Sequence, residues 1–357
     1  MTREIKLLIL LVTDDCNLRC RYCYARGGEK KEYMSWETAR KAVDYVAARS
    51  KSFKIQFSGG EPLLNFPLIK RVIEYEKMRW GSAAFQLQTN GTLIDRVLAR
   101  ELKTLRVRPG VSLDGPLDLN DHLRPIVGGE GSASAVIRGL QFLAAEGIRV
   151  GLTTVLTAES VQTLPQLVDW AAYTGNVYGI SLDLFRPLGR GVKTDLSAPD
   201  LNLLESQVRA ALLRADQLVR LGGPRVRFRE LERLRYQITQ GVVREEYCYA
   251  TTGQCMAVMP DGGVYPCASL MSLPHFYLGN INEQNFSLAE AVAGKEWIGR
   301  KAEMMTGCRD CPDRHLCGGG CLARSYVYTG RVDKPYEGDC RLKKTFLDWV
   351  RQDEGVC

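Results

Sequence analysis

The stretch LLILLVTDDCNLRCRYCYA, residues 7–25, joins an apolar run to three closely spaced cysteines. The run over residues 7–12 is shorter than the apolar core of a signal peptide, and it favours a buried parallel strand that is apolar on both faces. Cys16, Cys20 and Cys23 follow it on one short loop. Three thiolates at this spacing can hold three irons of a four-iron cluster. The fourth iron is then open to chelate an amino and a carboxylate group of a small molecule.

Strand and helix patterns alternate through the first half of the chain. The expected strands cover residues 5–12, 53–57, 84–88, 107–113, 148–156 and 177–185. The expected helices between them cover residues 35–49, 67–78, 95–103, 132–146 and 161–172. This alternation predicts an α/β fold with a parallel sheet and helices outside, and six such units suffice for a partial, TIM-like (β/α)6 barrel. In such a barrel the chemistry lies at the C-terminal ends of the strands.

Short motifs follow the first four expected strands. The cysteine loop follows the first, SGGEP at 58–62 the second, TNG at 89–91 the third, and Asp114 with Gly115 the fourth. These motifs are therefore expected on one rim of the barrel. Glycine lacks a Cβ, so Gly59 and Gly60 let the backbone approach a ligand, and exposed carbonyls there can accept from an ammonium group. Taken alone, the glycine pair would be an ordinary turn.

A second group of cysteines occupies the C-terminal part of the chain. Its eight members are Cys248, Cys255, Cys267, Cys308, Cys311, Cys317, Cys321 and Cys340. Eight thiolates complete two four-ligand sites, which iron–sulfur clusters or structural zinc ions could occupy. The segment is loop-rich, with a hairpin expected over 256–266, and metal ligation would supply its fold. Cys357 stands alone and is expected to be a disordered terminal thiol.

The length of 357 residues suggests two domains and allows a large core that needs no disulfides. We expect the barrel at 1–198, a helical linker at 199–247 with helices at 200–221 and 231–240, and a cysteine-rich domain at 248–357. No stretch approaches the ~18 apolar residues of a membrane span. We therefore expect a cytoplasmic protein with no membrane partner, where cysteines stay reduced and available to metals.

The net charge of +7 is a mild bias that does not by itself indicate nucleic acid. No RNA-binding signature or basic run interleaved with aromatic residues is present, so no nucleic-acid partner is expected. The most basic stretch carries five arginines between residues 225 and 235, broken by Glu230 and Glu232. It is either a solvated helix face with Glu–Arg pairs or a landing site for an acidic peptide.

The spacing of the first three cysteines, with Tyr22 before the third and a Gly-Gly-Glu-Pro motif after the second strand, resembles the radical SAM superfamily. The resemblance implies that the open iron binds S-adenosylmethionine (SAM) and that a reduced cluster cleaves it to a 5′-deoxyadenosyl radical, which abstracts hydrogen from a substrate. Gly59, Gly60 and Glu61 would bind the amino group of SAM. Tyr22 would lie along its adenine through backbone contacts.

Three further residues are weaker candidates for contacts to the ribose and carboxylate of SAM. They are Asn90, Ser112 and Arg124. An Asn-Gly turn, a strand serine and a surface arginine would explain them equally well.

The C-terminal cysteines resemble the SPASM domain of peptide-modifying radical SAM enzymes. The resemblance implies two auxiliary clusters, and therefore three 4Fe–4S clusters in all. One auxiliary cluster would be held by Cys248, Cys255, Cys267 and Cys321. The other would be held by Cys308, Cys311, Cys317 and Cys340. Both are fully ligated, which suits them to carry electrons between the active site and the surface.

The function implied is hydrogen abstraction from a peptide, followed by an oxidative modification such as a thioether or carbon–carbon cross-link. Ala268 follows Cys267 where sulfatase-maturating relatives carry an acidic base, which argues against sulfatase maturation by that mechanism. The alternatives are sulfatase maturation with a different base, radical oxidation of a small molecule, and a non-catalytic iron–sulfur or zinc scaffold. No proton-handling residue is identified; Asp114 and Asp121 are either substrate contacts or solvated loop carboxylates.

The expected partners are a peptide substrate and an external electron donor such as flavodoxin or ferredoxin. The first strand begins by about residue 5, which leaves no room for an N-terminal domain that grips a leader peptide. Leader binding would then need a separate protein or a groove on this one, or no leader at all.

Overall fold

A computed structural model describes residues 4–353, so Cys357 lies outside the described residues. One sheet of nine strands runs through the molecule, in the order β7-β6-β5-β4-β3-β2-β1-β8-β9. Its strand order does not return on itself, so the barrel is open. The fold is therefore the predicted α/β partial barrel, with a C-terminal cysteine-rich part.

All six strands predicted for the first half form, and neighbouring strands pair in parallel. They are β1 (Leu7–Leu11), β2 (Phe53–Ser58), β3 (Ala83–Thr89), β4 (Arg108–Ser112), β5 (Val150–Leu156) and β6 (Val177–Leu184). β1 is buried on both faces, as its unbroken apolar run predicted. Leu8 and Leu10 pack into the main core, whereas Ile9 and Leu11 face Ala257 and Met271 from the C-terminal part.

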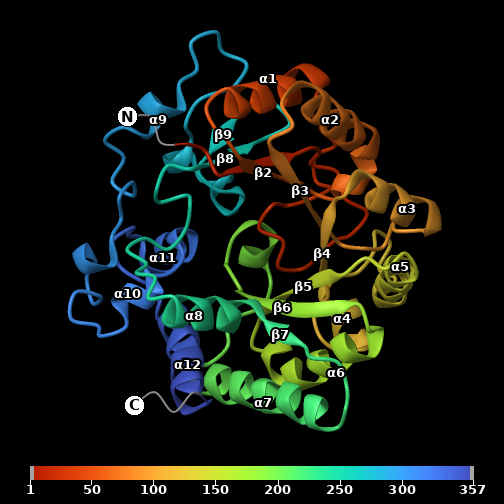
Figure 1. The fold of residues 1–357 in the computed structure, drawn as a ribbon, viewed down its shortest axis with the longest axis vertical. Helices are drawn as coiled ribbons and strands as arrows, with labels where there is room; N and C mark the ends of the chain where they lie inside the picture. The colour runs from red at the N-terminus through yellow and green to blue at the C-terminus, as the bar shows by residue number, and fades with distance from the viewer. Residues whose placement is uncertain (1–3, 354–357) are drawn as a thin grey trace.

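The predicted helices lie outside the sheet. They are α1 (Trp36–Ala47), α2 (Phe66–Arg79), α3 (Arg96–Leu105), α5 (Ala133–Ala145) and α6 (Leu164–Thr174). Ser35 caps α1, because its hydroxyl accepts a hydrogen bond from the Thr38 N–H at 3.1 Å. A short helix that the sequence analysis did not predict, α4 (Leu117–Leu123), lies between β4 and α5. Figure 1 shows α3 and α5 on one side of the molecule and the C-terminal segment on the other.

Strands from outside the barrel repeat extend the sheet at both ends. The predicted hairpin forms from β8 (Cys255–Val258) and β9 (Val264–Tyr265), and β8 pairs in parallel with β1. At the other end β7 (Arg227–Phe228) pairs with β6. The sheet thus crosses both expected domain boundaries. The sequence pattern did not show this, because the pairing partner of a strand is not part of its own pattern.

The remaining helices belong to the linker and the C-terminal part. They are α7 (Leu201–Arg220), α8 (Arg229–Thr239), α9 (Leu288–Val292), α10 (Arg314–Cys317), α11 (Leu322–Thr329) and α12 (Glu337–Asp353). The first two match the helices expected in the linker. Within residues 4–353 no helix combines the length and apolar character needed to cross a membrane.

Candidate functional site

A cavity of about 200 Å³ opens at the C-terminal ends of the barrel strands. Its lining brings together Cys16, Cys20 and Cys23 with residues that follow or end β2, β3 and β4. Six of the seven predicted cofactor residues line it: Tyr22, Gly59, Gly60, Asn90, Ser112 and Arg124. The lining also includes Tyr24, Asp183 and Arg186, which the sequence analysis did not single out. Their one sequence signal was position, at the end of a strand or beside the cysteine loop.

The two glycines of the GGEP motif bring the second rim loop against the cysteine loop. A Cβ on Gly59, whose φ is +143°, would lie 2.2 Å from the carbonyl oxygen of Thr13. A Cβ on Gly60 would lie 2.2 Å from the carbonyl oxygen of Asp15. The Gly60 N–H donates to the Thr13 carbonyl at 2.8 Å. Glycine is therefore required here for contact between two backbones, in addition to any approach to a ligand.

Glu61 is fully buried, and its carboxylate ties two rim loops together. It accepts hydrogen bonds from the Leu63 N–H at 3.1 Å, the Thr89 hydroxyl at 2.7 Å and the Asn90 N–H at 2.8 Å. Burial raises the pKa of Glu61, while these hydrogen bonds act in the opposite direction. Unlike the glycines, Glu61 does not line the cavity, so its side chain acts by fixing the positions of β2 and β3 residues that do.

Tyr22, Asp114 and Arg124 form a buried group at the cavity wall. The Tyr22 hydroxyl donates to Asp114, and the Arg124 Nη1 donates to the Tyr22 hydroxyl at 2.5 Å. Asp114 also accepts from the Thr154 hydroxyl at 3.1 Å and the Val155 N–H at 2.8 Å. Asp114 is fully buried and Arg124 is 6% exposed, so neither is the solvated loop or surface residue that the sequence allowed.

Arg124 is equipped to bind an anionic group in the cavity. Its Nε is buried and has no hydrogen-bond partner among the described residues. An unpartnered buried donor is costly, and a ligand carboxylate would satisfy it. This observation fits the carboxylate of SAM.

The other predicted contacts are already engaged with neighbouring side chains. The Asn90 Nδ2 donates to Asn17 at 2.8 Å, and its Oδ1 accepts from the Thr92 N–H at 2.9 Å. The Ser112 hydroxyl accepts from the Gln88 amide at 3.2 Å. Asp121, which the sequence offered as a substrate contact, accepts from the Ala133 N–H at 2.6 Å at the start of α5 and does not line the cavity.

The three loop thiols form a donor set that favours a cationic ligand. All three are free, and burial raises the pKa of Cys16 to about 12 and that of Cys20 to about 11. A buried thiolate is unfavourable unless a positive charge compensates it, which iron ions would provide. Arg190 holds this loop, because its Nε donates to the Cys20 carbonyl at 3.0 Å and its Nη1 to that of Gly27 at 3.1 Å.

The eight C-terminal cysteines gather at two places. Cys308, Cys311, Cys317 and Cys340 line one cavity of about 340 Å³, together with Lys343 and Lys344. The other four lie close enough to influence one another electrostatically. Burial is the main cause that raises the pKa values of Cys248, Cys255 and Cys267. Cys321 raises the pKa of Cys248 further, and Cys248 does the same for Cys255 and Cys267. The grouping matches the two ligand sets expected from the sequence, whose assignment as ligands remains a prediction.

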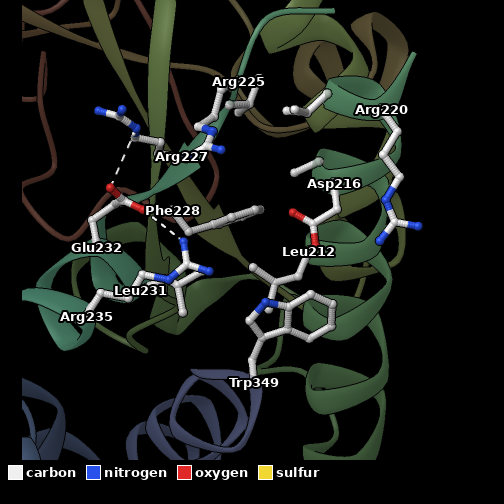
Figure 2. A pocket seen from close by; sticks show the side chains of 13 residues that line it. Leu212, Asp216, Arg220, Arg225, Arg227, Phe228, Leu231, Glu232, Arg235 and Trp349 are labelled. Carbon is white, nitrogen blue, oxygen red and sulfur yellow. Dashed lines mark hydrogen bonds and ion pairs between the residues drawn. The ribbon is translucent and has the colours of Figure 1, made fainter. Parts of the chain in front are cut away.

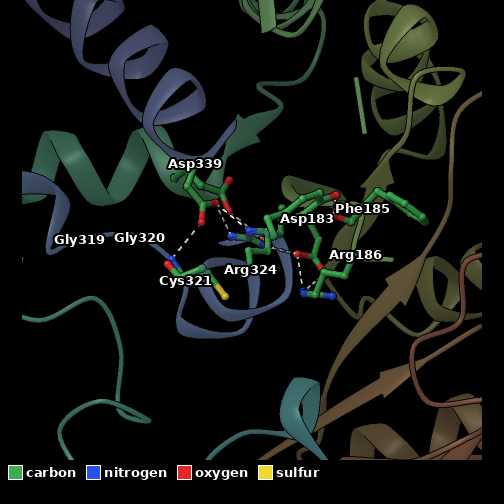
Figure 3. A network of polar contacts seen from close by, with 12 residues as sticks. Asp183, Phe185, Arg186, Gly319, Gly320, Cys321, Arg324 and Asp339 are labelled. Atoms are coloured by element: carbon green, nitrogen blue, oxygen red, sulfur yellow. Dashed lines mark hydrogen bonds and ion pairs between the residues drawn. The ribbon is translucent and has the colours of Figure 1, made fainter. Parts of the chain in front are cut away.

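A chain of buried ion pairs connects the cavity to the second cysteine group (Figure 3). Arg186 donates to both Asp183 oxygens at 2.6 and 2.7 Å, and Arg324 donates to Asp183 at 2.7 Å. Arg324 also donates to Asp339 at 2.7 Å, and Asp339 accepts from the Cys321 N–H at 3.0 Å. We call this chain the Asp183–Asp339 network; it joins the end of β6 to helices α11 and α12.

Two family models match the chain. The radical SAM superfamily model matches residues 10–171, and the model of the SPASM iron–sulfur cluster-binding domain matches residues 248–312. The chain belongs to the radical SAM superfamily and carries a SPASM domain. It is therefore an enzyme, and its family implies 4Fe–4S clusters and SAM as cofactors.

Two relatives show how far the likeness extends in sequence. An uncharacterized protein of Methanocaldococcus jannaschii is 34% identical over 288 residues, which are 80% of this chain and 92% of the relative. The cysteine-type anaerobic sulfatase-maturating enzyme of Clostridium perfringens is 26% identical over 334 residues, which are 89% of this chain and 88% of the relative.

Two solved structures share the fold. The enzyme anSMEcpe, bound to AdoMet and the Cp18Cys peptide, has a TM-score of 0.82 at 23% identity and covers 98% of this chain and 97% of its own. Streptococcus suis SuiB, bound to precursor peptide SuiA, has a TM-score of 0.69 at 15% identity. The match covers 94% of this chain and 76% of the SuiB chain.

The contact between the two rim loops is tested by Gly60→Ala. The added methyl would overlap the Asp15 carbonyl, so we expect a loss of about 1–3 kcal/mol in unfolding free energy and a loss of iron from the first site. Urea unfolding and iron analysis after anaerobic reconstitution measure the two effects. Gly151→Ala is the control, because its methyl would lie 3.4 Å from the tip of Tyr178. Wild-type stability and iron content in Gly60→Ala would contradict this account.

The Asp183–Asp339 network is tested by Arg324→Gln. Removing this buried cation leaves two carboxylates short of a partner, which costs about 3–5 kcal/mol. Arg331→Gln, which breaks an exposed pair with Asp333, should cost at most ~1 kcal/mol. Chemical unfolding of the two variants, both purified anaerobically, gives the comparison. Equal losses from both substitutions would refute a structural role for the network.

Arg324→Gln should also make the protein less stable in acid. Burial would raise the pKa of Asp183, but Arg186 and Arg324 outweigh it and lower the pKa below 3.8. A lowered carboxyl pKa contributes stability that is present above the unfolded value and lost as pH falls through the folded value. Arg324→Gln should raise the folded pKa, so the variant should begin to lose stability at a higher pH than wild type in an acid titration followed by circular dichroism. Superimposable acid titrations would contradict this.

Proposed function

We propose that this enzyme uses radical SAM chemistry to oxidise a peptide, forming a cross-link such as a thioether or a carbon–carbon bond. The observation that carries the proposal is the set of side chains that share one cavity. The cysteine loop, the GGEP glycines and Arg124 fit SAM. Tyr24, Asp183 and Arg186 line the same cavity without being expected SAM contacts, and they would be left to contact a substrate.

Arg186 and Tyr24 offer contacts suited to a peptide backbone. The Arg186 Nε is buried and has no partner among the described residues, although both Asp183 oxygens bind the rest of its guanidinium. The Arg186 guanidinium also lies over the Tyr24 ring, 5.3 Å from its centre. A fixed donor beside an aromatic ring can hold a carbonyl oxygen and orient the side chain next to it. Both structural neighbours described above bind a peptide, which supports this class of substrate.

The residues of the chain bind and orient, while the cofactors supply the radical chemistry. SAM, when bound and reductively cleaved, supplies the radical that removes hydrogen from the substrate. Arg124 would hold the SAM carboxylate, and Arg186 would position the peptide against it. The buried Tyr22 and Leu18 at the cavity wall help to exclude water, which protects a reactive radical from side reactions.

Sulfatase maturation remains the second candidate because of the Clostridium perfringens relative. Asp183 is the one carboxylate among the residues that line the cavity. Its two arginine partners lower its pKa, which makes it a weak general base. Ala268, beside Cys267, offers no base at all. The side chains of the cavity therefore favour peptide cross-linking over sulfatase maturation.

We further propose three 4Fe–4S clusters on the eleven cysteines and a flavodoxin- or ferredoxin-like electron donor in the cytoplasm. The exposed Lys344 beside the 308–340 cysteine group would attract an acidic donor. A leader segment, if the substrate has one, would bind a separate protein or a groove on this one.

Metal content tests the cofactor assignment. Anaerobically reconstituted protein should contain on the order of twelve irons per chain, and Cys20→Ala about four fewer. Cys20→Ala should also fail to form 5′-deoxyadenosine from SAM under strong reductant. Cys340→Ala is the matched control, because it should lose a similar amount of iron and still cleave SAM. Zinc in place of iron, or SAM cleavage by Cys20→Ala, would overturn the assignment.

The peptide reaction is tested by co-expression with short candidate peptides, followed by mass spectrometry. We expect a peptide to lose two hydrogens with the wild type and none with Cys20→Ala. A mass change seen only with a peptide from a sulfatase would establish sulfatase maturation instead. SAM cleavage without any peptide change, together with oxidation of an added small molecule, would show that the substrate is not a peptide.

A further inference from the structure

A third cavity, of about 420 Å³, forms a groove between α7, β7, α8 and α12. Its floor is apolar: Leu212, Phe228 and Leu231 are buried at 3%, 1% and 5% exposure. Trp349 of α12, a partly exposed residue, also lines the groove (Figure 2). The groove can therefore accept an apolar side chain of a ligand.

The rim of the groove is mainly positive. Four arginines line it against two acidic residues: Arg220, Arg225, Arg227 and Arg235, with Asp216 and Glu232. Glu232 already pairs with Arg227 at 3.6 Å and Arg235 at 3.3 Å. The side chains of Arg220 and Arg225 are exposed and have no hydrogen bond or ion pair within residues 4–353. Their charges are thus available to an anionic partner.

The groove lies beside the strand that leads to the catalytic cavity. Arg227 and Phe228 of β7 pair with Gly179 and Ile180 of β6. Asp183 follows on β6 three residues later, roughly 10 Å along the strand. Glu230 holds α8 to the same strand, because its carboxylate accepts from the Ser181 hydroxyl at 3.1 Å.

β7 is also the last strand of the sheet, so one of its edges pairs with no other strand among the described residues. An edge strand offers backbone groups to an extended peptide, which nucleic acid cannot use in the same way. The apolar floor, positive rim and edge strand together favour a peptide.

We propose that this groove binds an acidic segment of the peptide substrate that contains an apolar residue. The proposal rests on the peptide function above and deepens it, because it assigns substrate recognition to this chain. The acidic segment would lie outside the residue that is modified. It would use Arg220 and Arg225 for charge and the floor beside Trp349 for an apolar anchor, and the modified residue would enter the cavity at the end of β6.

Fluorescence anisotropy with the full-length enzyme tests the proposal. The probe is a fluorescein-labelled octapeptide, Glu-Glu-Leu-Glu-Glu-Leu-Glu-Glu. We expect the double variant Arg220→Glu/Arg225→Glu to raise its Kd about tenfold at low salt. The control, Arg108→Glu/Arg138→Glu, makes the same change in net charge at two exposed arginines outside the groove and should change Kd by less than about twofold.

Further measurements decide the chemistry of the partner. Replacing the probe's glutamates by glutamine, or Trp349 by alanine, should weaken binding severalfold. Equal weakening by the two double variants would show non-specific attraction to a cationic protein and overturn the proposal. The proposal would also be overturned if an eight-nucleotide single-stranded DNA bound the wild type more tightly than the octapeptide does, and if Arg220→Glu/Arg225→Glu abolished that binding.

SAM cleavage separates failure of the groove from failure of the proposed function. Arg220→Glu/Arg225→Glu should form 5′-deoxyadenosine at the wild-type rate, because both residues lie outside the catalytic cavity. Suppose that the wild type cleaves SAM and modifies a peptide, and that Arg220→Glu/Arg225→Glu binds and modifies that peptide equally well. The groove proposal then fails, while the proposed function stands. If the wild type never modifies a peptide, the proposed function fails first.

Discussion

The close approach of residues 59–60 to residues 13–15 is the contact on which the catalytic cavity depends. Two backbones meet there with no room for a side chain, so the cysteine loop is positioned by main-chain hydrogen bonds rather than by its own conformation. Glu61 extends the same contact to the third strand. The GGEP motif therefore has two tasks in one segment: it would present backbone to SAM, and it fixes the loop thiols relative to three barrel strands.

The Asp183–Asp339 network extends this rigidity into the SPASM domain. Arg324 lies between two carboxylates, one at the cavity and one bonded to the backbone of Cys321. Buried ion pairs of this kind add little net stability, but they are costly to break and so hold one geometry. Together with the pairing of β8 to β1, they make the barrel and the cysteine-rich part a single structure. A fixed separation between the catalytic cavity and the auxiliary cysteines is what electron transfer between them would require.

Local pattern was sufficient for much of the fold. Each of the six barrel strands and the five longer helices between them was predictable, because their apolar periodicity is repeated and their ends carry caps and glycines, as at Ser35. The short strand β7 was not predictable, since two residues carry no periodicity. The pairing of β8 with β1 was not predictable either, because it joins segments about 250 residues apart. The same limit applies to Asp114 and Arg124, which a single sequence could not distinguish from solvated residues.

The sequence by itself determined the chemistry: the cysteine spacings, the GGEP motif and Ala268 are linear features, and their meaning depends on residue type and distance along the chain. Only the tertiary structure decided which side chains share a cavity. Tyr24, Asp183 and Arg186 share a cavity with the predicted cofactor residues because the strands curve into a barrel. Arg220 and Arg225 border an apolar groove because α7, α8 and α12 pack around β7. Such groupings arise from long-range packing, in which residues far apart in sequence become neighbours when the core is buried.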